Sequence, residues 1–317
     1  MKLILELSGE HPTLPFAEAE CIGEILEKGM QVAVVECEDP NAAKRLAMTH
    51  CIISYLGQCP AEIGRFKEML DSLAITSELP FACRVKKIQD TTIPESQLDL
   101  EGCMGGRIKG TVSLKNPQRE YRAIFSGTTC YFGEVLHKID RGSYEYRNPM
   151  RRAFFHPGVM MPILARTLVN IAQGRENDLL LDPFCGTGGI LLEGLMLNMR
   201  TVGTDMDITM LKGCLSNLPQ TEVLKVDSTK LPITDCSVDT IATDLPYGQS
   251  VCIKAESMNA LYNDSLSEMR RVLKKGRRAV VVTHVDIREI AKRHFTIVQY
   301  HEQRVHKSLT RRIMVLE

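Results

Sequence analysis

Hydrophobic and polar positions follow two different rhythms along this chain. Up to about residue 138, short apolar runs alternate with amphipathic stretches and polar turns. The pattern predicts strands at 3–7, 31–37, 52–56, 81–88, 111–114, 121–125 and 130–136. It predicts helices at 16–27, 41–48, 63–73 and 97–107. These elements make two small α+β units in succession.

From residue 178 the rhythm becomes a regular alternation of strand and helix. Strands are expected at 179–181, 201–204, 222–226, 238–243 and 279–283, with helices between them that include 190–197 and 257–273. Such alternation is typical of an α/β protein with a parallel, doubly wound sheet. The last apolar runs, 295–300 and 313–316, have no helix between them, so the sheet should finish antiparallel. The polar, arginine-rich stretch 139–155 predicts a linker, and Pro162 fits the first turn of the helix that follows.

Size and composition narrow the class of protein. The 317 residues are enough for two domains, and 44% are hydrophobic, so a packed core is expected. No apolar run reaches the roughly 18 residues that span a bilayer, and Glu6 comes too early for a signal peptide. We therefore expect a soluble, cytoplasmic protein with no membrane partner. The eleven cysteines are an odd number without a Cys-x-x-Cys pair, which predicts reduced thiols and no metal site.

Charge is balanced over the whole chain but gathered locally. The formal net charge is zero, so bulk charge lends no support to a nucleic-acid partner. Basic residues nevertheless form three clusters, each of which taken singly is most simply a solvated face. They are Arg141, Arg147, Arg151 and Arg152; Arg270, Arg271, Lys274, Lys275, Arg277 and Arg278; and Arg304, Lys307, Arg311 and Arg312.

A glycine-rich turn follows the strand expected at 179–181. Backbone without Cβ atoms can approach a ligand there, at Gly186, Gly188 and Gly189. A bare Gly-x-Gly also occurs in structural turns and in dinucleotide enzymes. Acids at the carboxyl ends of three successive strands favour S-adenosylmethionine instead. These are Asp182 for its ammonium, Asp205 for the ribose hydroxyls, and Asp227 with Ser228 for the adenine amine.

The tetrapeptide Asp244-Leu245-Pro246-Tyr247 ends the strand expected at 238–243. Taken alone, Asp244 could be a turn residue. An exocyclic amine, however, is a poor nucleophile because its lone pair is delocalised into the ring. The Asp244 carboxylate and the Leu245 carbonyl would each accept one N–H and so localise that lone pair. Pro246 restricts Leu245 to extended geometry, and Tyr247 would stack on the base. The sequence therefore predicts methyl transfer to the amine of an unstacked base.

Together these residues resemble the THUMP-containing tRNA guanine-N2 methyltransferases that modify guanosine 10 in archaea and eukaryotes. The resemblance rests on Phe155 to Gly158, Asp182 to Gly189, Asp205, Asp244 to Gly248 and the tail His306 to Arg311. A weaker likeness to the family's N-terminal domains lies in Phe81 to Ile88, Gly102 to Ile108 and Asn116-Pro117. The chain departs from the family's usual Asp-Pro-Pro-Tyr at Leu245, which puts the rigidity of that loop in question.

The resemblance implies a domain plan and a set of functional residues. The plan is a ferredoxin-like domain at 1–75, a THUMP domain at 76–138, a linker at 139–155 and a Rossmann-like class I methyltransferase domain at 156–317. The partner would be tRNA, in some members with a small zinc-binding activator subunit. RNA would be held by Arg84, Lys86, Arg107, Lys307 and Arg311. S-adenosylmethionine would be held by His156, Pro157, Gly158, Asp182, Phe184, Gly186, Thr187, Gly188, Asp205, Met206, Asp227, Ser228 and Asp244.

Two other functions stay open. The same tetrapeptide serves DNA and rRNA amine methyltransferases, although the chain has no DNA-reading helix motif and no DNA partner is expected. An RNA-binding protein that keeps the cofactor fold without its chemistry is the second, and Leu245 alone suggests it. A sister group of the family modifies guanosine 6. The residues distinguish neither that position from guanosine 10 nor one methyl group from two.

Overall fold

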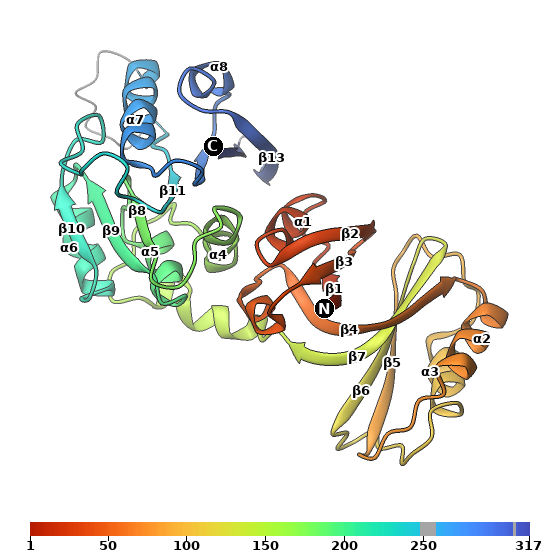
Figure 1. The fold of residues 1–317 in the computed structure, drawn as a ribbon. Helices are drawn as coiled ribbons and strands as arrows, with labels where there is room; N and C mark the ends of the chain where they lie inside the picture. The colour runs from red at the N-terminus through yellow and green to blue at the C-terminus, as the bar shows by residue number, and fades with distance from the viewer. Residues whose placement is uncertain (248–257, 307–308) are drawn as a thin grey trace. The chain divides into compact units, whose positions relative to one another are not determined.

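The structure, a computed structural model, describes residues 1–247, 258–306 and 309–317. The chain divides into two compact units, Met1–Asp140 and Arg141–Glu317, which we describe in turn (Figure 1). None of the helices in the described ranges has the length and apolar character needed to cross a membrane.

One seven-stranded sheet runs through the first unit in the order β2-β3-β1-β4-β7-β6-β5. Its strands are β1 (Lys2–Leu7), β2 (Gly23–Gly29), β3 (Val32–Cys37), β4 (Thr49–Pro60), β5 (Phe81–Lys87), β6 (Arg119–Ser126) and β7 (Thr129–Lys138). Neighbours are antiparallel except β5 and β6, which are parallel. The twelve-residue β4 pairs with β1 on one side and β7 on the other. The two expected α+β segments thus share a sheet, and their division near residue 75 stays a prediction.

The helices of this unit cover the sheet in two places. They are α1 (Leu14–Ala19), α2 (Ile63–Leu73) and α3 (Gln97–Gly105), and a 3-10 helix, η1 (Pro40–Arg45), stands where a longer helix was expected. Figure 1 shows α2 and α3 together against the part of the sheet that holds β5 and β6. Phe66 and Leu100 bury their side chains there against Phe81 and Phe125. The Phe66 and Phe125 rings meet edge to face, 5.2 Å apart.

Two predicted elements of the first unit are wrong. The helix expected at 16–27 ends at Ala19, and residues 23–29 form β2. This strand gains a ladder with β3, from Gly23 opposite Cys37 to Gly29 opposite Val32, and that non-local pairing outweighs the helical spacing. The strand expected at 111–114 is only an isolated bridge at Val112. Val112 is 50% exposed and Leu114 is 67% exposed, so a full strand here would bury little apolar surface.

The second unit holds another seven-stranded sheet, in the order β10-β9-β8-β11-β12-β14-β13. Its strands are β8 (Leu179–Asp182), β9 (Arg200–Asp205), β10 (Glu222–Lys225), β11 (Thr240–Asp244), β12 (Ala279–Thr283), β13 (Ile297–His306) and β14 (Leu309–Leu316). The first five strands in spatial order are parallel, whereas β14 is antiparallel to β12 and β13. The predicted parallel sheet with an antiparallel finish is confirmed.

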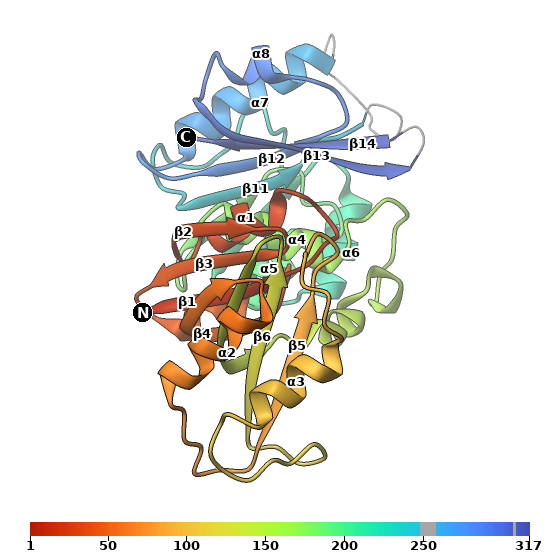
Figure 2. The ribbon, with the colours of Figure 1, turned by 90° about the vertical axis from the view of Figure 1, so that its right-hand side faces the viewer.

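Helices lie on both faces of this sheet. They are α4 (Pro162–Ile171), α5 (Gly189–Leu195), α6 (Ile208–Asn217), α7 (Met258–Val272) and α8 (Arg288–Ala291). Figure 2 shows α7 and α8 on one face and α4, α5 and α6 on the other. Pro162 stands in the first turn of α4 as expected, while Ser257, the expected start of α7, lies outside the described residues. The stretch expected as a linker carries two 3-10 helices, η2 (Arg141–Arg147) and η3 (Pro149–Arg151).

The connections of this sheet create a switch point. From β8 the chain moves outward through β9 to β10, and from β11 it moves the other way to β12. Since β8 and β11 are neighbours, their carboxyl ends flank the crevice where open α/β sheets bind ligands.

Candidate active site

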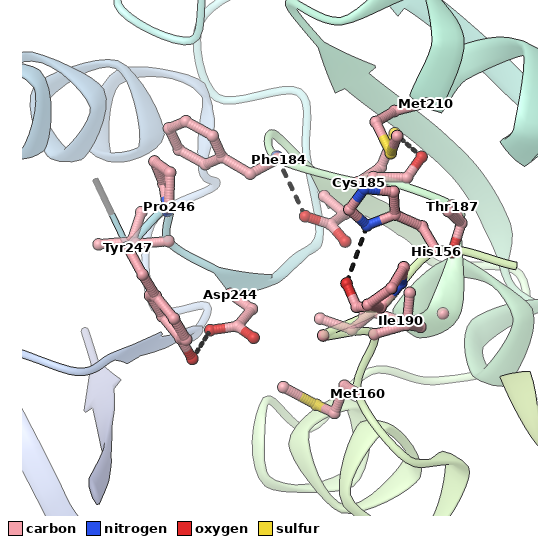
Figure 3. A pocket seen from close by; sticks show the side chains of 17 residues that line it. His156, Met160, Phe184, Cys185, Thr187, Ile190, Met210, Asp244, Pro246 and Tyr247 are labelled. Atoms are coloured by element: carbon pink, nitrogen blue, oxygen red, sulfur yellow. Dashed lines mark hydrogen bonds between the residues drawn. The ribbon is translucent and has the colours of Figure 1, made fainter. Parts of the chain in front are cut away.

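A pocket of about 250 Å³ opens at the carboxyl edge of the second sheet (Figure 3). Four segments line it: the stretch before α4, the turn between β8 and α5 with the residues that flank it, the first turn of α6, and the end of β11 with the loop that follows. The lining residues are His156, Pro157, Gly158, Val159, Met160, Asp182, Phe184, Cys185, Gly186, Thr187, Gly189, Ile190, Met210, Asp244, Leu245, Pro246 and Tyr247. The pocket therefore gathers residues from most of the motifs that the sequence singled out.

The turn between β8 and α5 depends on glycine. Gly186 has a φ of +49° and Gly188 a φ of +84°, in the left-handed region that side chains disfavour. The Gly186 N–H donates to Asp205 Oδ2 at 3.0 Å, which ties the turn to the end of β9. A Cβ atom at Gly186 or at Gly158 would meet nothing within 4 Å. Both glycines line the pocket, and each leaves open the space that a Cβ atom would take.

Asp182 lies at the floor of the pocket and is only 2% exposed. Its Oδ1 accepts a hydrogen bond from Thr243 Oγ1 at 2.7 Å and another from the Phe184 N–H at 3.1 Å. The first of these joins β8 to β11. Burial raises the pKa of the Asp182 carboxyl to about 7, against the effect of both hydrogen bonds. A ligand ammonium beside it would favour the ionised form.

The other strand-end acids have partners of their own. Burial raises the pKa of Asp205, whose carboxylate accepts from the Gly186 and Asp207 N–H groups. Asp227 Oδ1 accepts from the Thr229 N–H and hydroxyl, and Ser228 Oγ lies 2.8 Å from Ser265 Oγ. The structure leaves five expected cofactor residues outside the pocket lining: Gly188, Asp205, Met206, Asp227 and Ser228.

The Asp244–Tyr247 loop is fixed at several atoms. The Leu245 N–H donates to the Val282 carbonyl at 2.9 Å, and Tyr262 Oη donates to the Pro246 carbonyl at 2.8 Å. The Leu245 side chain is 1% exposed and belongs to the core beneath α7. Leucine at this position therefore anchors the loop by packing, where the resembled family has proline.

Asp244 and Tyr247 face each other across one end of the pocket. Tyr247 Oη donates a 2.6 Å hydrogen bond to Asp244 Oδ1, as Figure 3 shows. Burial raises the pKa of Asp244 to about 6, while the Tyr247 hydrogen bond and the positive charge of Arg311 on β14 lower it. At neutral pH the carboxylate is therefore mostly ionised and can accept hydrogen bonds from an amine.

Comparison with known proteins identifies the family. Residues 149–313 match the family described as "RMKL-like, methyltransferase domain". The tRNA (guanine(10)-N2)-dimethyltransferase of Methanothermobacter thermautotrophicus is 31% identical over 341 aligned positions, which cover 100% of this chain and 99% of that relative. The chain belongs to the RMKL-like methyltransferase family. The dimethyltransferase of the same name from Methanocaldococcus jannaschii is 35% identical over 215 positions, 61% of either chain.

A solved structure shows the same fold. The crystal structure of TrmN from Thermus thermophilus superposes with a TM-score of 0.53 at 20% identity, over 100% of this chain and 99% of that one. At this level of identity the likeness concerns the fold alone. The second unit accordingly has the α/β methyltransferase fold that its strand order and connections indicate.

The residues expected to hold RNA lie in both units. Arg84 and Lys86 lie two residues apart in β5, so their side chains share a face of the first sheet. Lys86 is exposed, and Arg84 Nη1 donates to the Cys83 carbonyl at 2.9 Å. Arg107 is ion-paired with Asp71 at 3.1 Å. Arg311 acts on Asp244 through its charge. Lys307 lies outside the described residues, as does Gly248, the residue after the tetrapeptide.

Sequence reasoning missed several residues of this methyltransferase site. Val159, Met160, Cys185, Ile190 and Met210 line the pocket but are apolar positions without a chemical signal. His284, directly after β12, packs its ring against Tyr247 with centroids 4.7 Å apart. The rule that located the strand-end acids also applies to His284, because β12 runs parallel to β11.

Proposed function

We propose that this chain transfers a methyl group from S-adenosylmethionine to the N2 amine of a guanosine in tRNA. The observation that carries the proposal is the Asp244 carboxylate, held at one end of the pocket whose other walls include the glycine turn. The full-length relative, named as a tRNA (guanine(10)-N2)-dimethyltransferase, supports tRNA as the substrate and guanosine 10 as its target.

The residues present fit S-adenosylmethionine. Gly158 and Gly186 leave room along the pocket wall, and the buried Asp182 suits an ammonium. Asp205 lies at the end of β9, the strand next to β8, where its carboxylate would accept hydrogen bonds from the ribose hydroxyls. When bound, the cofactor supplies a methyl group activated by the positive charge on sulfur.

The chemistry of the chain's own residues is alignment. The guanine amine is weakly nucleophilic because its lone pair is delocalised. The Asp244 carboxylate and the Leu245 carbonyl each accept one N–H, which draws the lone pair back onto nitrogen and aims it. Tyr247 releases the Asp244 oxygen to which its hydroxyl donates and offers its ring to the base. Asp244 then accepts the proton that the amine loses.

The first unit serves RNA binding in this proposal. We assign residues 1–75 to a ferredoxin-like domain, 76–138 to a THUMP domain and 139–155 to a linker ahead of the catalytic domain at 156–317. Arg84 and Lys86 on one face of β5 support a role in holding phosphates. In this proposal the protein acts in the cytoplasm, as the sequence led us to expect, and the family resemblance alone suggests a zinc-binding activator subunit.

The proposal is tested by incubating the protein with labelled S-adenosylmethionine and unmodified tRNA, and with duplex DNA as the competing substrate. Digestion of the tRNA then identifies the modified nucleoside, its position and the number of methyl groups. Label in N2-methylguanosine or its dimethyl form supports the proposal. Label in DNA only, or no label with any activator supplied, contradicts it.

A further inference from the structure

A buried carboxylate in the second unit holds two arginines and has a third beside it. Glu193 of α5 is 0% exposed. Its Oε1 accepts from Arg147 Nε and its Oε2 from Arg166 Nε, each at 2.8 Å. Arg152 lies close enough for its charge to interact with both Glu193 and Arg147. Three guanidinium groups thus surround one carboxylate, which leaves an excess of positive charge.

Arg152 is the arginine that Glu193 does not pair. Its Nε donates to the Arg147 carbonyl at 3.0 Å. Its Nη1 and Nη2 are both buried, and neither has a hydrogen-bond partner within the described residues. Burial lowers the pKa of Arg152, and the charge of Arg147 lowers it further against the opposing effect of Glu193. Buried donors on a charged group are costly unless an acceptor satisfies them, so this guanidinium calls for an anion.

A small cavity of about 110 Å³ has Arg152 in its lining. Gly188 and Leu218 are buried lining residues, whereas Ala153 and Ser216 are exposed and mark its mouth. The Asn217 side chain fixes one wall, since its Nδ2 donates to the Phe154 and Thr187 carbonyls at 3.0 and 3.1 Å. The recess is therefore built by hydrogen bonds and opens to the surface.

We propose that this recess binds a phosphate group, and that in the working enzyme the group belongs to the RNA backbone next to the target nucleotide. A guanidinium with two unpartnered nitrogens matches two phosphate oxygens, and Lys212, exposed one turn before Ser216 on α6, adds positive charge near the mouth. Arg152 does not line the cofactor pocket, although Gly189, next to Gly188, does. The RNA source rests on the proposed function, because an enzyme that extracts a base must also grip its backbone.

The test uses two changes at the recess and a matched control. Ser216→Asp puts a negative charge at the exposed mouth without touching the core, and Arg152→Gln removes the buried charge. Thr296→Asp adds the same charge to an exposed site on the N-terminal side of β13, whereas α6 lies by β9 and β10 at the opposite edge of the sheet. Each protein is assayed for the KM of tRNA, the KM of S-adenosylmethionine and kcat. Its melting temperature is also measured with inorganic phosphate and with chloride at equal ionic strength.

We expect Ser216→Asp to raise the KM of tRNA by about tenfold, the loss of one charge-assisted contact, with kcat and the KM of S-adenosylmethionine unchanged. Phosphate should stabilise the wild type and Thr296→Asp more than it stabilises either recess variant. If the recess variants lose phosphate stabilisation but keep the KM of tRNA, the site takes a free ion and the RNA assignment is wrong. If neither quantity changes, or only the KM of S-adenosylmethionine rises, the phosphate site is refuted. The melting assay needs no methyl transfer, so it separates failure of this site from failure of the proposed function.

Discussion

Replacing Tyr247 by phenylalanine tests how the ionisation of Asp244, the acid that aligns the amine, is controlled. The change removes one hydroxyl and keeps the ring. That hydroxyl donates the 2.6 Å hydrogen bond to Asp244 Oδ1. Burial raises the pKa of Asp244 to about 6, and the hydrogen bond from Tyr247 works in the opposite direction. In Tyr247→Phe the ionised carboxylate loses a donor while its burial remains, so its pKa should rise further.

The size of this effect follows from the strength of the hydrogen bond. A hydrogen bond to a charged group contributes roughly 1.5–3 kcal/mol, and one pH unit corresponds to about 1.36 kcal/mol. The midpoint should therefore move up by about one to two pH units. Because Asp244 keeps some exposure to solvent, we expect the lower end of that range.

The assay is the pH dependence of kcat/KM for methyl transfer to tRNA, which reports the ionisation of the free enzyme. Activity should rise with pH as Asp244 ionises, with a midpoint near the pKa of about 6 in the wild type and at least about one pH unit higher in Tyr247→Phe.

Tyr262→Phe is the matched control for this experiment. It removes a hydroxyl that donates to the Pro246 carbonyl at 2.8 Å in the same loop, and its midpoint should stay with the wild type. An unchanged or lower midpoint in Tyr247→Phe would refute the reasoning about this carboxylate.

Three further predictions concern packing, buried charge and RNA. Gly213→Ala would place a Cβ atom 2.1 Å from Phe154 Cδ1. Although alanine favours helices, this clash should lower the free energy of unfolding by about 1–3 kcal/mol. An unchanged urea unfolding curve would mean that Phe154 does not pack on α6. Glu193→Gln leaves the buried Arg166 and the partly buried Arg147 without their carboxylate and should lower the free energy of unfolding by about 3 kcal/mol. A loss under about 1 kcal/mol would contradict a buried ion pair. Replacing Arg84, Lys86 and Arg107 should weaken tRNA binding and flatten its salt dependence, because phosphate contacts are lost. If the slope of tRNA affinity against salt concentration is unchanged, these residues do not hold RNA.

The catalytic half could be predicted well because its signals are local. The strand-end position of Asp182, Asp205 and Asp244 follows from short apolar runs, and parallel strands bring their carboxyl ends together. The floor of the pocket was therefore predictable. The hydrogen bond from Thr243 on β11 to Asp182 on β8 could not be predicted, because it depends on these two strands being neighbours in the sheet.

What the sequence could not show depends on distant partners. Residues 23–29 have helical spacing, yet pairing with β3 makes them a strand. Arg147 and Arg152 belong to a basic cluster that could be a solvated face, but Glu193, more than forty positions away, pairs with Arg147. Arg311 is predicted to hold RNA, which stays a prediction, and nothing in the sequence indicated that its charge would also lower the pKa of Asp244. In each case the deciding neighbour comes from another element.

The central claim is that the Asp244 carboxylate aligns the amine for methyl transfer. The most direct measurement is the single-turnover rate of methyl transfer to tRNA, compared between the wild type and Asp244→Ala at saturating S-adenosylmethionine and RNA. We predict that the variant is slower by at least about a hundredfold while its affinity for tRNA stays within a few-fold of the wild type. A variant that transfers the methyl group at the wild-type rate would contradict this account.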